Sequence, residues 1–175
     1  ILGFLQKASR EAALATTWTD QDPEFEARLA ALAAAVTSPE GPARGVLQAV
    51  ADRIAEPGLV VQLGHKLVQL AAPGVPDVYQ GTEVPFPTLV DPDNRRFVDY
   101  QALGAGEGAP EDVDKQRIVR AAMHLRRERP QLFLEGGYRA IFAAGPAREH
   151  AVGMVRTLDD APQVIAVATR TPLAL

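Results

Sequence analysis

The chain has 175 residues, a formal net charge of −4 and no cysteine. The acidic balance argues against a surface for nucleic acid or anionic membranes, and the lack of cysteine excludes disulfides, thiolate chemistry and cysteine-ligated zinc. Hydrophobic residues make up 47% and charged residues 23%, as in a globular domain with a core, and no apolar run is long enough to span a membrane. The chain begins at Ile1 without an initiator Met or a basic leader, so we expect a cytoplasmic protein of which this sequence is a part.

The first 72 residues predict helices. A helix start is clearest at Asp22-Pro23, where an acidic N-cap precedes a proline in the first helical position. An apolar stripe follows at helical spacing, formed by Phe25, Leu29, Leu32 and Val36. A break is expected at Pro57-Gly58. The predicted helices cover about 2–15, 23–36, 44–56 and 59–72.

Trp18 follows the first predicted helix and is the only tryptophan of the chain. It lies in the run Ala15–Thr19, whose threonines are poor helix formers and end that helix. Two interpretations stay open. Trp18 packs at an element boundary, because an indole buries a large area, or it is a platform on which a sugar ring stacks.

The segment from Ala71 to Tyr100 carries most of the functional signal. A Pro-Gly turn leads into Val75–Tyr79, an apolar run that predicts a buried strand. The chain then breaks at Gln80–Glu83 and continues as a polar loop stiffened by prolines, which is where binding and catalytic groups usually lie. The alternative is an ordinary surface loop whose acidic and basic side chains pair with one another.

The second half of this loop gathers Asp91, Asp93, Asn94, Arg95 and Arg96. Calcium bound by the aspartates and the asparagine needs six or more oxygens, and EF-hand spacing would place Arg95 at a ligand position. Phosphate held by the two arginines lacks a glycine-rich cradle before a helix. A third hypothesis pairs Glu83 with one of the aspartates as the two carboxylates of a retaining glycosidase.

Beyond residue 104 the sequence predicts one more helix and then strands. After a glycine-rich spacer, a helix is expected over 111–128, ending before Pro130, with the basic cluster at 126–129 as its solvated end. Three strands are expected, over 137–142, 150–157 and 163–169. Helices followed by antiparallel strands place a domain boundary near residue 130, between 1–130 and 131–175.

Several motifs together resemble malto-oligosyltrehalose synthase, a family of the alpha-amylase superfamily. The central ones are G-V-P-D-V-Y-Q-G-T-E at 74–83 and L-V-D-P-D-N-R-R at 89–96. The pattern R-E-A-x-L-x-T-x-W-T at 10–19 precedes them, and L-R-R-E-R-P-x-L-F at 125–133 with G-G-Y-R at 136–139 follows. The resemblance covers nearly the whole chain.

The resemblance implies an α/β fold in which residues 1–130 are the C-terminal part of a (β/α)8 barrel, including its last strand and helix. Residues 131–175 would begin an antiparallel, sandwich-like β-domain. The loop after a barrel strand lies on the catalytic face, so the segment from Gln80 to Tyr100 would line the substrate cleft. We expect substrate contacts from Tyr79, Gln80, Glu83, Asp91, Asp93, Asn94, Arg95 and Arg96, because carboxylate, amide and guanidinium groups suit sugar hydroxyls.

The family converts the reducing-end α-1,4 linkage of a malto-oligosaccharide into an α,α-1,1 linkage by intramolecular transglycosylation. The superfamily uses an Asp nucleophile, a Glu acid/base and a third Asp, with no metal or organic cofactor. All three carboxylates would lie before Ile1, so the chain would supply cleft wall and no catalytic acid. Its expected partners are the sugar substrate and the rest of its own barrel, with no nucleic acid and no membrane.

Some positions depart from the family pattern. Ala13 stands for a usual Lys and Ala15 for a usual His, Pro85-Phe86-Pro87 replaces a Trp-Asp pair, and Phe97 replaces a Pro. Two other hypotheses therefore stay open: a non-catalytic glucan-binding or scaffold module, and a degenerate homologue.

Overall fold

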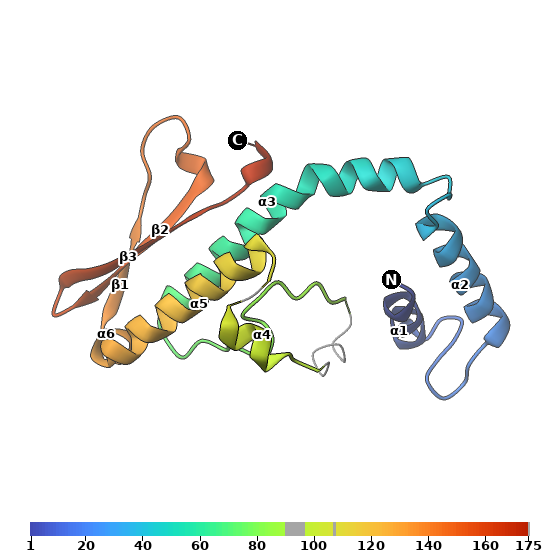
Figure 1. Ribbon diagram of the computed structural model, residues 1–175, viewed down its shortest axis with the longest axis horizontal. Coiled ribbons are helices and arrows are strands. Elements are labelled where there is room, and N and C mark those ends of the chain that lie inside the picture. The colour runs from blue at the N-terminus through green and yellow to red at the C-terminus, as the bar shows by residue number, and fades with distance from the viewer. Residues whose placement is uncertain (90–96, 107, 175) are drawn as a thin grey trace. The chain divides into compact units, whose positions relative to one another are not determined.

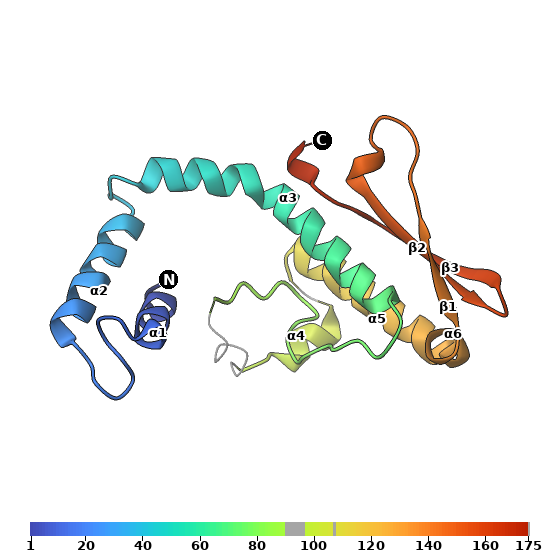
Figure 2. The same ribbon diagram turned by 180° about the vertical axis from the view of Figure 1, so that it is seen from behind.

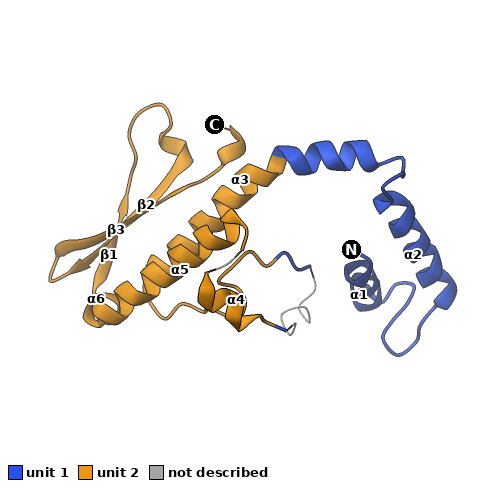
Figure 3. Cartoon of the chain, in the orientation of Figure 1, with its two compact units in different colours: residues 1–53, 87–97 blue, residues 54–86, 98–175 orange. Residues whose placement is uncertain are grey.

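The computed structural model describes residues 1–89, 97–106 and 108–174. The chain divides into two compact units, which are described separately (Figure 3). Unit 1 comprises residues 1–53 and 87–97, and unit 2 comprises 54–86 and 98–175. No helix among the described residues is long and apolar enough to cross a membrane.

Unit 1 is built on two helices, α1 (Leu2–Ala12) and α2 (Pro23–Thr37). The predicted start of α2 is confirmed, since the Asp22 carboxylate accepts a hydrogen bond from the Phe25 amide at 2.9 Å and Pro23 opens the helix. The predicted apolar stripe is only partly buried. Leu32 and Val36 are exposed, whereas Phe25 and Leu29 are half-buried.

One long helix, α3 (Arg44–Ala71), replaces the two helices predicted on either side of Pro57. The prediction of a break was wrong. Proline removes one backbone hydrogen bond, but the amides on both sides of Pro57 continue the ladder and hold the helix together. The division between the two units falls within this helix, after residue 53.

Unit 2 combines the end of α3 and three further helices with a small sheet (Figure 1). Besides the end of α3 it contains α4 (Tyr100–Ala105), α5 (Pro110–Glu128) and α6 (Pro130–Leu134). Helix α5 lies alongside the C-terminal half of α3, as both views show (Figures 1 and 2). The helix predicted at 111–128 is thus confirmed, whereas α4, whose amides at Gln101 and Ala102 are capped by Asp99, was missed.

The three predicted C-terminal strands are confirmed as β1 (Gly137–Ile141), β2 (Ala151–Leu158) and β3 (Ala161–Thr169). They form an antiparallel sheet in the order β1-β2-β3. Leu158 pairs with Ala161, so the hairpin between β2 and β3 turns on Asp159 and Asp160, both at positive φ. Such a turn matches the twist of the strands, and aspartate tolerates its backbone angles.

The buried strand predicted at Val75–Tyr79 is absent: this part of the described chain is extended but unpaired, and Val75 is 88% exposed. A strand requires a neighbouring strand to bond its amides and carbonyls, and 75–79 has none among the described residues. The described part of the chain is therefore mixed helix and sheet, with one small antiparallel sheet. The predicted domain boundary near residue 130 stays a prediction.

Candidate functional site

The centre of the predicted site is a tight turn at residues 79–82. The Tyr79 carbonyl accepts hydrogen bonds from the Thr82 amide at 3.0 Å and from the Thr82 hydroxyl at 2.6 Å. Gly81 sits at φ 82°, with Val98 Cγ2 3.1 Å from where a Cβ would be, so both the backbone angle and the space favour glycine. This explains the glycine of the Q-G-T-E motif in local terms.

Three side chains of neighbouring helices hold the segment around this turn. Lys115 of α5 donates to the Val84 carbonyl at 2.8 Å, Gln69 of α3 donates to the Asp77 carbonyl at 3.0 Å, and Arg126 of α5 donates to the Gly74 carbonyl at 2.7 Å. Because each donor comes from a helix, tertiary contacts hold the segment although it has no strand ladder among the described residues.

Two of these donors are charged, Lys115 and Arg126, and Lys115 is the more deeply buried of the two. Burial lowers the pKa of its ammonium group, the charge of Lys66 lowers it further, and the Glu83 carboxylate opposes both effects. Helix α5 therefore supplies a cation beneath the turn that carries Glu83, at a position where the hydrogen bond to Val84 orients the backbone.

The described members of the predicted site differ in exposure and bonding. Tyr79 is exposed, and the exposed Gln80 accepts a hydrogen bond from the Tyr100 hydroxyl at 3.1 Å. Glu83 keeps its Oε2 buried with no hydrogen-bond partner among the described residues. Tyr79 and Gln80 are available to a ligand, and Glu83 has an unused acceptor. A hollow of about 400 Å³ lies beside the same segment, lined by Pro85, Gln62 and Glu111 among others.

The remaining predicted site residues, Asp91, Asp93, Asn94, Arg95 and Arg96, lie outside the described residues. The calcium, phosphate and carboxylate-pair hypotheses all involve these residues and stay predictions. Among the residues that the structure does describe, no cluster of three His, Asp or Glu side chains is arranged to hold a metal ion.

Two arginines join the end of α3 to the sheet. Arg156 of β2 is fully buried, at 0% exposure, and donates to the carbonyls of Ala71 at 3.1 Å and Leu132 at 2.8 Å. Arg126 donates to the carbonyls of Leu70 and Ala72, both at 2.9 Å. The two guanidinium groups lie 5.1 Å and 4.4 Å from the ring centre of Phe133.

These contacts correct the prediction of a solvated helix end at Arg126, which is partly buried and caps another helix, whereas residues 127–129 are exposed as predicted. The last carbonyls of a helix lack internal partners, and the arginines supply donors to those of α3. Burial lowers the pKa of both guanidinium groups, and for Arg126 the charge of Arg156 adds to this.

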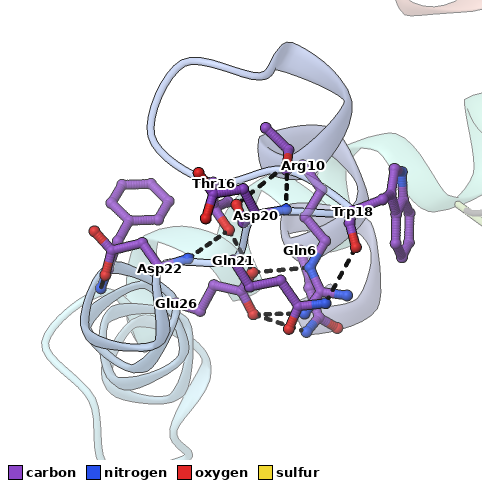
Figure 4. A network of polar contacts seen from close by, with 10 residues as sticks. Gln6, Arg10, Thr16, Trp18, Asp20, Gln21, Asp22 and Glu26 are labelled. Carbon is purple, nitrogen blue, oxygen red and sulfur yellow. Dashed lines mark hydrogen bonds and ion pairs between the residues drawn. The ribbon is translucent and has the colours of Figure 1, made fainter.

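A second polar cluster lies in unit 1 (Figure 4). Arg10 of α1 donates from Nε to Glu26 Oε1 at 2.8 Å and from Nη2 to Glu26 Oε2 at 2.7 Å. The Thr16 hydroxyl and the Gln6 amide donate to the same carboxylate at 2.7 Å and 3.2 Å. Hydrogen bonds from Arg10, then from Thr16, lower the pKa of Glu26 to about 2. The Arg10 guanidinium lies 5.0 Å from the ring centre of Trp18.

Sequence reasoning missed Lys115, Arg126 and Arg156 as structural donors. The signal for Arg156 was present, since a single arginine interrupts the apolar run of β2 in V-G-M-V-R-T-L. For Lys115 and Arg126, the hydrogen-bond acceptors are backbone carbonyls 31 and 52 residues away. No pattern of side chains in the sequence indicates such partners.

Comparison with known proteins identifies relatives over most of the chain. No family profile matches it. A protein of Mycobacterium tuberculosis (strain CDC 1551 / Oshkosh) named "Putative maltooligosyl trehalose synthase" is 40% identical over 153 residues, covering 87% of this chain and 20% of that protein. The homologue named in the same way in strain ATCC 25618 / H37Rv agrees to the same extent.

Solved structures give the same result. The maltooligosyltrehalose synthase of Arthrobacter ramosus superimposes with a TM-score of 0.83 at 41% identity, covering 99% of this chain and 23% of that one. A second structure, that of a maltooligosyl trehalose synthase, gives a TM-score of 0.70 at 26% identity over 89% of this chain and 22% of that one. The chain is therefore homologous to the maltooligosyl trehalose synthases and corresponds to a segment of them, about a fifth of their length.

Proposed function

We propose that the chain is part of an enzyme that isomerises malto-oligosaccharides, converting the reducing-end α-1,4 linkage into an α,α-1,1 linkage in trehalose biosynthesis. The observation that carries the proposal is the 41% identity and TM-score of 0.83 to the Arthrobacter ramosus synthase over 99% of the chain. At that similarity the backbone and the side chains that shape a site usually persist together. The activity belongs to the complete enzyme, of which this chain is a segment.

Within that enzyme the chain contributes a wall of the substrate cleft. Residues 75–79 would complete their hydrogen bonding as the last strand of a (β/α)8 barrel, once strands supplied by the rest of the enzyme lie beside them. This accounts for an extended, unpaired segment that three helix-borne donors hold in place. The turn that follows would then lie at the catalytic face.

The side chains of this turn suit a sugar. Exposed Tyr79 offers an apolar ring, Gln80 offers an amide with free hydrogen-bonding capacity, and Glu83 has an acceptor without a partner among the described residues. The five polar residues from Asp91 to Arg96 would extend the same wall. The catalytic carboxylates would come from the part of the enzyme that precedes this chain, and its partners are that part and the sugar substrate.

The proposal is tested by comparing the chain alone with the same chain joined to its upstream sequence. The 175-residue chain alone should not turn over maltopentaose, whereas the complete enzyme should form a product with a non-reducing terminal trehalosyl unit, detected as loss of reducing ends without release of glucose. Full turnover by the isolated chain would contradict the assignment of the catalytic acids to the upstream part.

A variant of the complete enzyme tests the role of the turn. Glu83→Gln removes the charge but keeps the shape, and it should raise KM or lower kcat/KM for maltopentaose roughly 10-fold, the scale of one charge-assisted hydrogen bond. Glu135→Gln is the matched control, since Glu135 is exposed at the end of α6 and lies outside the lining of the hollow. If the Glu83 variant and the parent have equal kcat and KM, Glu83 does not contact the substrate.

A further inference from the structure

Trp18 is 54% exposed, although burial of the large apolar area of an indole is energetically favourable. One part of its ring is covered by the Arg10 guanidinium, whose carbon lies 5.0 Å from the ring centre. The rest of the ring remains open to solvent, and Figure 4 shows it at the edge of the polar cluster of unit 1. Trp18 is thus held at the surface by the Arg10 guanidinium, which packs against part of its ring.

The support is rigid because two nitrogens of the Arg10 guanidinium bind one carboxylate. Its Nε and Nη2 atoms donate to both oxygens of Glu26, a paired geometry that fixes the plane of the guanidinium. The Thr16 hydroxyl and the Gln6 amide bind the same carboxylate. The low pKa of Glu26, about 2, keeps this acceptor ionised at neutral pH. A guanidinium held in this way stays in place under the indole.

The backbone that carries Trp18 is also fixed. Thr16 is buried, and its Oγ1 accepts from the Asp22 amide at 3.2 Å while donating to Glu26. Two further bonds span Trp18: the Thr17 amide donates to the Asp20 carbonyl at 2.8 Å, and the Asp20 amide donates to Thr17 Oγ1 at 2.7 Å. Little conformational entropy is therefore left to lose when a ligand contacts the ring.

We propose that the exposed part of the Trp18 ring is a stacking platform for a glucose unit of an α-1,4-glucan, with Arg10 as the residue that positions it. The choice of a glucan as ligand rests on the proposed function. The surroundings of the ring favour a sugar over an apolar protein surface, because exposed Thr19, Asp20 and Gln21 flank it with groups that bond hydroxyls in fixed directions. A pyranose ring offers an apolar face of matching size between rows of hydroxyls.

Trp18 is the only tryptophan, so its fluorescence reports on this place alone. In the 175-residue chain, a near-UV circular dichroism band of the indole first shows that the loop is formed. Maltoheptaose should then change the emission in a saturable way and protect the ring from quenching by iodide. Sorbitol at equal mass, a polyol without a ring face, is the control. No saturable change, or an equal change with sorbitol, overturns the proposal.

Variants separate a sugar contact from a protein contact. In native gels containing amylopectin, Trp18→Ala should lose the retardation shown by the parent, and Trp18→Phe should retain part of it. Leu14→Ser is the matched control, because Leu14 is the neighbouring apolar side chain and is 92% exposed. If Leu14→Ser reduces binding as much as Trp18→Ala, the surface is an apolar contact and the proposal fails.

Kinetics of the complete enzyme distinguish this proposal from the proposed function. Trp18→Ala should raise KM for maltoheptaose roughly 5- to 10-fold with kcat retained, the signature of a binding contact remote from the reacting bond. Arg10→Lys should raise KM less and weaken the near-UV band of Trp18, as expected of a positioning residue. An unchanged KM in Trp18→Ala overturns the platform and leaves the enzyme assignment intact. A parent enzyme that does not turn over maltopentaose defeats the enzyme assignment and leaves the binding measurements on Trp18 standing.

Discussion

Replacing Arg156 by methionine tests how much its hydrogen bonds stabilise the packing of the sheet of unit 2 against the helices. Arg156 is fully buried and donates to four carbonyls, those of Ala71, Leu132, Gly136 and Gly137. The first two bonds are buried, and each carbonyl left without a donor costs about 1–3 kcal/mol, or about 2–6 kcal/mol for the pair. Methionine offsets part of this loss, because it also removes a buried cation that has no carboxylate partner in the described chain. We expect a net loss of about 2–4 kcal/mol.

Hydrogen exchange measured peptide by peptide provides the assay, because it reports on the sheet separately from unit 1. A loss of that size should speed exchange in the peptides that contain β2 and β3 by roughly 30- to 1,000-fold. Arg139→Met is the control: Arg139 is exposed on β1, and its removal should change stability by less than about 0.5 kcal/mol. If Arg156→Met lowers the stability of the sheet no more than the control, or raises it, the hydrogen bonds from Arg156 to the carbonyls do not stabilise the sheet.

Two further predictions concern unit 1. The folded-state pKa of Glu26 is lowered to about 2 from an ordinary value of 4.5, so its contribution to stability is fully present above pH 4.5 and is lost as the pH falls toward 2. Trp18 fluorescence should show unfolding of unit 1 over that range, and Glu26→Gln should be less stable at neutral pH and lose less on acidification. A parent stability that is flat from pH 5 to 2 would contradict the ion pair. Ala13 ends α1 at φ 54°, a left-handed angle that glycine adopts without a Cβ penalty, so Ala13→Gly should stabilise the unit by about 0.5–1 kcal/mol in thermal melts. Ala15→Gly, at a position without positive φ, should bring no such gain, and equal effects of the two changes would refute the explanation.

Local signals in the sequence predicted local structure. The Asp22-Pro23 start of α2, the end of α5 before Pro130 and the three strands of the sheet depend on nearby residues and on hydrophobic periodicity, and each was found. Pro57 shows where such signals fail. A proline cap and a proline within a helix look alike in sequence, and only the intact ladder on both sides distinguishes them.

The binding role of the candidate site residues stays a prediction, and the side chains that support the turn could not be predicted from the sequence. The resemblance of its motifs pointed to Tyr79, Gln80 and Glu83, and the structure shows a turn there that needs the glycine at 81. The donors that hold this turn, such as Lys115, come from another helix and bind backbone carbonyls. No pattern of side chains along the chain reveals such partners, because a carbonyl is present at every residue.

The amino-acid sequence by itself indicated helices α1, α2 and α5, the three strands of the sheet and the motifs that relate this chain to the maltooligosyl trehalose synthases. The tertiary structure alone decided that residues 75–79 have no strand partner among the described residues, that Arg126 and Arg156 meet over Phe133, and that Trp18 is exposed beside a fixed arginine. The physical reason is that strand pairing, burial of a charge and exposure of an indole depend on groups distant in sequence, whereas helix and turn propensities depend on neighbours.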